Sequence, residues 1–241
     1  MKNLWIFYLS VALLFALPSC QYADGRLIEG DGQLVTDTID LDRFENIKLS
    51  GMFNVTLTKG NNRQVIVETD ENLQELVDIQ VSDETLIIST RHKTILKPTR
   101  MKLTITYSDL KKVSIAGACK LNSTEPVESR DLMLDISGAA EIDLVVNTNV
   151  LSTNLSGAGK ISLQGVADKH NADLSGASIL QTSSLITRET RINLSGAGSA
   201  EVYASDLLEA NLSGVGSIRY FGSPSEKIIN RSGIGTIQSG N

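Results

Sequence analysis

Hydrophobic and polar positions in the second half of the chain follow a repeat that is anchored on one glycine. The motif first reads IAGAC and ISGAA, then LSGAG, LSGAS and LSGAG, and finally LSGVG and RSGIG. Consecutive anchoring glycines are 18 to 21 residues apart. These glycines are Gly117, Gly138, Gly157, Gly176, Gly196, Gly214 and Gly233. A repeat of this length predicts a solenoid with one repeat unit per coil.

Apolar residues alternate with polar residues on both sides of this glycine. Two positions before it stand Ile115, Ile136, Leu155, Leu174, Leu194 and Leu212, and four positions after it stand Leu121, Ile142, Ile161, Leu180, Ala200, Ile218 and Ile237. Three positions before it the residues are polar, namely Ser114, Asp135, Asn154, Asp173, Asn193, Asn211 and Asn230. Alternation with a period of two predicts a strand on each side of a turn, with the apolar columns inside and the polar column outside.

The glycine at the turn has two physical explanations that the sequence leaves open. Either the backbone there has a positive φ, or a neighbouring backbone comes too close for a Cβ atom. The second glycine of the motif is less strict, because Ala140 and Ser178 replace it in two copies. The serine before the first glycine can satisfy backbone groups of the turn with its hydroxyl.

The predicted fold is all-β, a single right-handed parallel β-helix with about 18–21 residues per coil and Ser-Gly-Ala-Gly turns. Residues 113–241 are the regular repeats, and residues 41–112 are predicted to be irregular opening coils of the same domain, with Asp70 to Val77 as a short helix or a loop. The sequence shows no capping helix after Ile237. An uncovered strand edge there predicts self-association, or a partner, at the last coil.

The first residues have the pattern of an export signal. Lys2 precedes an apolar run from Leu4 to Leu17, and Leu17-Pro18-Ser19-Cys20 resembles a lipobox, although Pro18 departs from the commonest pattern. We therefore expect a signal peptide over residues 1–19, lipid on Cys20, and a flexible tether over residues 20–40. The alternative of an uncleaved membrane helix is disfavoured because the run is shorter than the roughly 20 residues that span a bilayer. The expected location is the cell envelope, as an outer-membrane lipoprotein.

From Phe44 to its end the chain resembles the putative autotransporter adhesin family, head GIN domain. The resemblance rests on Phe44 to Val55, on Leu86-Ile87-Ile88, on the segment from Leu110 to Gly117, and on the series of Ser-Gly-Ala-Gly turns. It implies a secreted or lipid-anchored β-helix, similar in shape to pectin-lyase-type solenoids but without their catalytic residues. It also implies a role in adhesion.

Candidate chemistry is sparse. A formal net charge of -6 argues against a nucleic-acid partner. No serine has an evident base, since His92 and His170 are the chain's two histidines and His170 is expected to be solvated on an outer strand. Cys119 lies among small residues and is expected to be buried. We predict no catalytic residue, no metal and no cofactor.

The outward Asp/Asn column is the most suggestive polar feature. Stacked carboxylates could bind calcium, but an amide ladder bonded along the stack is favoured because the dense aspartates of calcium-binding repeats are missing. A basic stretch over residues 91–112 could meet anionic glycans, and a solvated strand face is the favoured interpretation.

The function predicted from these observations is non-enzymatic binding. A cell-envelope lipoprotein would display the β-helix as an adhesin towards a glycan or a protein surface, with its N-terminal lipid in the membrane. Two alternatives remain open at this point. One is a carbohydrate-active β-helix enzyme, and the other is a periplasmic scaffold or envelope-stress component.

Overall fold

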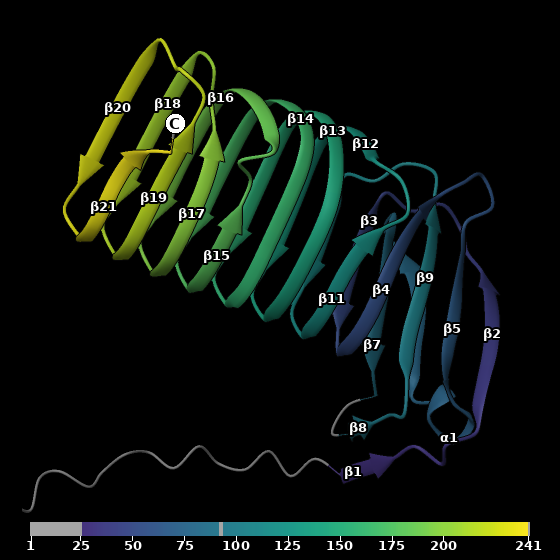
Figure 1. Ribbon diagram of the computed structural model, residues 1–241. Coiled ribbons are helices and arrows are strands. Elements are labelled where there is room, and N and C mark those ends of the chain that lie inside the picture. The colour runs from purple at the N-terminus through teal and green to yellow at the C-terminus, as the bar shows by residue number, and fades with distance from the viewer. Residues whose placement is uncertain (1–25, 92–93, 241) are drawn as a thin grey trace, which may run out of the picture.

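The computed structural model describes residues 26–91 and 94–240, and most of them lie in strands (Figure 1). Strands that follow a turn glycine form one long face, here called face A: β4 (Met52–Lys59), β11 (Ala118–Ser123), the first parts of β13 (Ala139–Leu155) and β14 (Ala158–Leu174), β15 (Ala177–Gln181), β17 (Ala197–Tyr203), β19 (Val215–Phe221) and β21 (Ile234–Ser239). Strands that precede the glycine form face B: β3 (Asn46–Ser50), β10 (Lys112–Ile115), β12 (Val127–Ile136), the second parts of β13 and β14, β16 (Leu185–Leu194), β18 (Leu207–Leu212) and β20 (Glu226–Arg231).

Coils stack in register through parallel pairing, which confirms the prediction of an all-β solenoid and gives it about seven turns. Leu155 lies opposite Leu174, and Leu174 lies opposite Leu194. These side chains are buried, as are those of the apolar column after the turn from Leu121 to Ile218. The predicted inward columns therefore form the core.

The structure shows which of the two explanations applies to the turn glycines. None of the seven has a positive φ, but a Cβ atom on any of them would lie 1.7–2.1 Å from the carbonyl oxygen of the equivalent glycine in the preceding coil. Gly51 occupies the same position in the first coil of the column, so we call Gly51 and the seven repeat glycines the corner glycines. Close backbone stacking, and not a left-handed conformation, requires glycine at these corners.

Hydrogen bonds continue the strand ladder through each corner. The amide of Ala177, for example, donates to the carbonyl oxygen of Gly157 in the preceding coil at 3.1 Å. The serine hydroxyls contribute as predicted, since the Oγ atoms of Ser137, Ser156 and Ser195 each lie 3.4 Å from a carbonyl oxygen of the coil before.

The second glycine of the motif is stricter than the sequence suggests. Ala140 and Ser178 carry a Cβ atom at this position, as expected of a tolerant site. A Cβ atom on Gly198, however, would lie 1.9 Å from the carbonyl oxygen of Ser178. A Cβ atom on Gly159, between the coils of Ala140 and Ser178, would likewise lie 2.5 Å from the carbonyl oxygen of Ala140, so the space at this position differs from coil to coil.

The N-terminal region differs from the predicted opening coils. Its elements are β1 (Arg26–Glu29), β2 (Leu34–Asp40), β5 (Gln64–Asp70), α1 (Glu71–Gln74), β6 (Val77–Ser82), β7 (Thr85–Thr90), β8 (Thr94–Lys97) and β9 (Met101–Tyr107). β7 and β9 pair with the outer sides of β3 and β4, and the chain then returns so that β10 pairs with the other side of β3. β9, β5 and β2 extend face A, while β7 and β6 extend face B, with antiparallel pairs that a simple coil lacks.

Part of the predicted tether is also strand. β2 pairs antiparallel with β5 from Leu34 to Asp40, and β1 occupies residues 26–29. The sequence signal for β2 is weak because it is an edge strand that buries little, with Val35 and Ile39 only partly covered. Cys20 and the predicted signal peptide lie outside the described residues. In the described part of the chain no helix has the length and apolar character to cross a membrane.

His170 is buried, which contradicts the expectation of a solvated histidine. It is 1% exposed, and its Nε2 atom lies 3.3 Å from Oγ1 of Thr153 in the neighbouring coil. Burial lowers the pKa of His170 to about 4, so the ring is neutral at physiological pH. Every second residue before the inward Leu174 also points inward, which places Ala172 and then His170 in the core. The alternation along the strand therefore already predicted that His170 is buried.

Replacing Gly176 by alanine is expected to destabilise the solenoid by about 3 kcal/mol, because stacked backbones would have to move apart. The new Cβ atom would lie 1.7 Å from the carbonyl oxygen of Gly157. Urea unfolding followed by circular dichroism measures the effect. Ala177→Ser is the matched control, since this neighbouring side chain is exposed and should change stability by less than about 0.5 kcal/mol. Equal unfolding midpoints for the two variants would contradict the stacking explanation.

Stability should also fall in mild acid because of His170. Its pKa is lower in the folded state than the ordinary value of 6.5, so the unfolded chain binds the extra proton first and stability is lost as pH falls from 6.5 towards 4. Between pH 7 and pH 4.5 the wild type should lose about 2 kcal/mol more than His170→Leu. Leucine suits this column, because Leu151 and Leu208 occupy it in other coils. Parallel pH profiles of the free energy of unfolding for the two proteins would refute this account.

Candidate binding surface

From Asp173 to Asn230 the outward polar column of face B is a hydrogen-bonded ladder. Nδ2 of Asn193 donates to Oδ1 of Asp173 at 2.7 Å, Nδ2 of Asn211 donates to Oδ1 of Asn193 at 2.8 Å, and Nδ2 of Asn230 donates to Oδ1 of Asn211 at 2.8 Å. The amide ladder that was favoured over a calcium site is therefore present over these four residues. Earlier in the column, Asp135 instead pairs with Lys112 at 3.1 Å. Among residues 26–91 and 94–240, no group of His, Cys, Asp and Glu side chains is placed to hold a metal ion.

Charged side chains on face B are paired between or within coils. Lys169 lies 3.1 Å from Glu189, and Arg191 lies 3.4 Å from Glu209 in the next coil. Bases of the 91–112 stretch are also paired with acids, since Arg100 contacts Glu68. Face B therefore presents few polar groups that lack a partner, and the basic stretch is largely neutralised.

Carboxyl groups with shifted pKa values are all more acidic than usual in the described part of the chain. They are Glu29, Glu45, Asp70, Glu128, Glu189 and Asp206. The hydrogen bond from Lys169 is the largest cause for Glu189, and the hydrogen bond from Ser205 is the largest for Asp206. A glycosidase needs one carboxyl with a raised pKa as its general acid, and these groups have the opposite shift.

Face A contains a groove across its later coils. It has a volume of about 240 Å³. Its lining comes from β15, β17, β19 and β21: Ile179, Leu180, Gln181, Ser199, Ala200, Glu201, Ser217, Ile218, Arg219 and Gln238. The small side chains of Ser199 and Ser217 leave room between the coils, while Ile179 provides an exposed apolar wall.

A column of long polar side chains runs through this groove, with one side chain in each of four consecutive coils. Gln181 lies opposite Glu201, Glu201 opposite Arg219, and Arg219 opposite Gln238. Nη1 of Arg219 lies 3.4 Å from Oε1 of Glu201, and Oε1 of Gln181 accepts a hydrogen bond from Ser162 at 3.3 Å. The side-chain amide of Gln238 has no hydrogen-bond partner among the described residues. At Gln238 the groove therefore offers a side-chain donor and acceptor that the described part of the protein does not use, while the other three side chains of the column each have one partner.

No residue of this column stands out in the sequence. It lies five residues after each corner glycine, one pleat beyond the inward apolar column, and its residue types differ from coil to coil. The regular spacing after the corner glycines could have revealed the column. The turn and the Asn ladder were recognised because the same residue types recur in them, and this column lacks such a recurrence.

Cys119 is buried, as predicted. Its Sγ atom lies 3.7 Å from the carbonyl oxygen of Gly51, and burial raises the pKa of the thiol to about 11. The thiol is therefore protonated at neutral pH and unsuited to act as a nucleophile.

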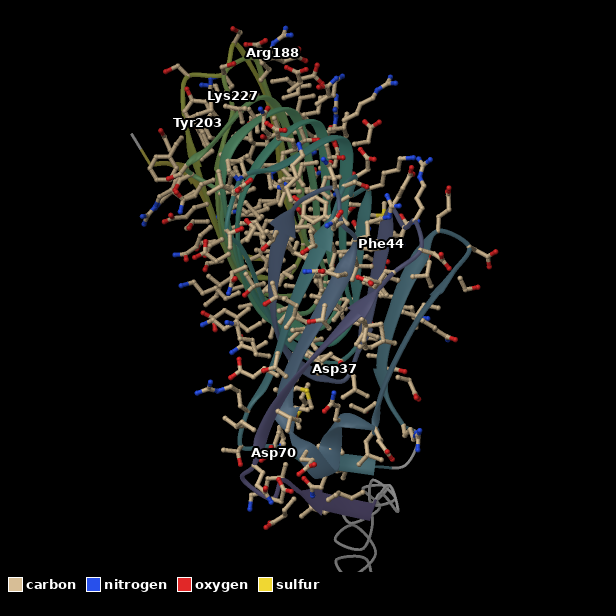
Figure 2. The ribbon with its side chains drawn as sticks, turned by 90° about the vertical axis from the view of Figure 1, so that its right-hand side faces the viewer. Asp37, Phe44, Asp70, Arg188, Tyr203 and Lys227 are labelled. Carbon is tan, nitrogen blue, oxygen red and sulfur yellow. The ribbon has the colours of Figure 1, made fainter. Side chains whose placement is uncertain are left out.

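The last described coil has different inward residues from the others. At the positions of Leu208 and Leu212 it carries Lys227 and Arg231, and Nη1 of Arg231 donates to the carbonyl oxygen of Gly235 at 2.8 Å. Lys227 lies far from Asp37 and Asp70 at the other end of the stack (Figure 2). A second copy stacked on this coil would bury two cations, so the predicted self-association stays a prediction and requires acidic groups in the partner surface.

Comparisons with known proteins agree with this architecture. The crystal structure of a putative adhesin from Bacteroides fragilis NCTC 9343 matches with a TM-score of 0.84 and 24% identity. The match covers 88% of this chain and 99% of that protein's chain. A putative lipid binding protein from Parabacteroides distasonis ATCC 8503 has a TM-score of 0.73 and 21% identity over 90% and 100% of the two chains. A putative adhesin from Parabacteroides merdae ATCC 43184 has a TM-score of 0.68 and 21% identity over 90% and 100%. At these identities the likeness shows the fold alone.

Sequence comparison identifies the family. No curated protein matches the chain. The family model described as "Putative auto-transporter adhesin, head GIN domain" matches residues 43–224, which is most of the chain and begins one residue before the segment that carried the resemblance. The protein therefore belongs to the putative auto-transporter adhesin family, head GIN domain.

Proposed function

We propose that this protein is a lipid-anchored adhesin of the cell envelope that binds an extended glycan in the groove of face A. The observation that carries the proposal is the polar column of Gln181, Glu201, Arg219 and Gln238, in register over four coils. Membership of an adhesin family supports the broader role and association with the cell envelope.

The chemistry of the groove suits a ligand rich in hydroxyl groups. A hydroxyl both donates and accepts hydrogen bonds, and the groove offers a carboxylate acceptor in Glu201, a guanidinium donor in Arg219, and amides that do both in Gln181 and Gln238. Successive coils repeat at the strand spacing of about 4.8 Å, so a polymer with repeating units can meet an equivalent position in each coil.

Face B is the weaker candidate for the same role. Its outward amides from Asn193 to Asn230 bond to one another along the stack. A ligand would have to replace those bonds before it gained any, whereas the side-chain amide of Gln238 on face A has none to lose among the described residues.

Anchoring is supported by the first twenty residues. An apolar run of signal-peptide length followed by Leu17-Pro18-Ser19-Cys20 resembles a lipoprotein signal, which would make Cys20 the lipid-modified first residue of the mature chain. A lipid anchor would hold the N-terminal end at the membrane and leave the groove, which lies in the later coils, as the displayed surface.

Binding to a glycan array with purified mature protein tests the groove. Changing Glu201 and Arg219 to alanine together is expected to weaken glycan binding at least tenfold, since both charged hydrogen-bonding groups are lost. The matched control is Arg191→Ala with Glu209→Ala, because this pair on face B has a similar separation of 3.4 Å and similar exposure.

Each other outcome of this experiment points to a different function. Equal binding by both double variants would exclude the groove. Release of shortened glycan products by the wild type would favour the enzyme alternative. Absence of any glycan ligand, together with protection from added protease on intact cells, would favour the periplasmic scaffold.

Anchoring has its own test. Cys20→Ser is expected to move the protein from the membrane fraction to the soluble fraction, because the lipobox would then lack the thiol that carries the lipid. Fractionation and immunoblotting measure this. Retention of the variant in the membrane fraction would contradict lipid anchoring through this residue.

A further inference from the structure

A small sheet of two strands lies apart from the main sheet at the N-terminal end (Figure 1). β1 and β8 pair in parallel, so that Leu27 lies opposite Ile95 and Ile28 lies opposite Leu96. Leu96 is 5% exposed and Ile28 packs against the core. Because side chains alternate along a strand, Leu27 and Ile95 point to the outer side of the small sheet, where their side chains are 55% and 49% exposed.

This outer side is apolar and carries no unpaired charge among its described side chains. One pleat beyond the aliphatic pair, Glu29 and Lys97 lie opposite each other, with Oε1 of Glu29 2.8 Å from Nζ of Lys97. The paired charges cancel, so contact with an apolar or zwitterionic surface would not bring a net charge with it. Long stems such as that of Lys97 can also keep their charged ends in water while the stem contacts apolar groups.

The small sheet is held firmly to the fold. Asp70 is buried, and its two carboxylate oxygens accept hydrogen bonds from the amides of Gly32 at 2.9 Å and Thr99 at 2.8 Å. These residues follow β1 and β8, so one side chain fixes the loops after both strands. Burial alone would raise the pKa of Asp70, but these hydrogen bonds together lower it below its ordinary value and keep the group charged.

A second contact fixes β1 to the helix. Nδ2 of Asn72 donates to the carbonyl oxygen of Glu29 at 2.8 Å, and Oδ1 of Asn72 accepts from the amide of Asp31 at 3.1 Å. The exposed pair is therefore presented in a fixed orientation relative to the solenoid.

Chain length limits how far this pair can lie from a lipid on Cys20. Leu27 is seven positions after Cys20, and seven fully extended residue steps span at most about 25 Å. The last corner, at Gly233, lies seven coil steps from Gly51, or about 34 Å further along the stack. Ile234 at that far corner is 76% exposed and offers a comparison within the same molecule.

We propose that the β1–β8 sheet rests on the bilayer that holds the lipid of Cys20, with Leu27 and Ile95 at the level of the headgroups. The proposal depends on the lipid anchoring proposed above. The anchor makes the contact intramolecular, so two aliphatic side chains suffice for a surface that would bind a membrane weakly by itself. The later coils of face A then point away from the membrane.

Spin labelling of the full-length lipidated protein in phosphatidylethanolamine and phosphatidylglycerol vesicles tests this orientation. One variant, Ile95→Cys, carries a nitroxide on the small sheet, and a matched variant, Ile234→Cys, carries the same nitroxide at the far corner. The buried Cys119 has a thiol pKa of about 11 and should not react. Because label and chemistry are identical, the comparison corrects for any affinity of the nitroxide for lipid.

The nitroxide at position 95 is expected to be at least fivefold less accessible than the one at position 234 to a water-soluble nickel complex, and more accessible to oxygen. Adding Leu27→Ser to the Ile95→Cys variant should reduce this contrast by half or more, with an unchanged circular dichroism spectrum. Equal nickel accessibility at both positions in vesicle-bound protein overturns the bilayer contact and leaves anchoring intact. Mass spectrometry that finds no lipid on Cys20 overturns anchoring and the contact together.

Discussion

Contact between the backbones of successive corner glycines is the constraint on which the rest of the structure depends. The carbonyl oxygen of one corner glycine occupies the space where the next would carry a Cβ atom, 1.7–2.1 Å from its ideal position. The same oxygen accepts the amide hydrogen bond that joins the coils at the corner. A side chain at a corner would disrupt both the close backbone contact and this hydrogen bond. The column from Gly51 to Gly233 therefore sets the distance and register of all the coils between them.

Fixed register turns each sequence position into a column, and the columns behave differently on the two faces. Outside face B, residues of matching type meet and bond to one another, as Asn193 and Asn211 do. Outside face A the column through Glu201 and Arg219 mixes residue types, and the side-chain amide of Gln238 finds no partner among the described residues. Both faces share one backbone geometry, so the difference between their outer surfaces comes from which side chains repeat.

Sequence alone predicted the parts of the structure that repeat. Gly176 and Leu174 recur in coil after coil, which revealed the corner, the inward column and the Asn ladder. β2 and β9 could not be placed in this way, because their partners are set by antiparallel pairs and by the return of the chain to β3. His170 was misjudged as solvated although alternation placed it inside, and the groove was missed because its column shares a spacing and not a residue type.

The two ends of the stack are chemically different, and this difference gives the molecule a direction. At the N-terminal end, Asp70 ties the loops after β1 and β8 to the start of α1 and fixes an aliphatic pair on the outer side. At the other end, Lys227 and Arg231 replace inward leucines and stop the apolar core. Between them every coil is bonded in register to the next, so there is no hinge within the stack that could bring the groove back to the N-terminal end. An attachment at that end therefore determines where the groove of face A is held, and the length of the glycine column determines how far away.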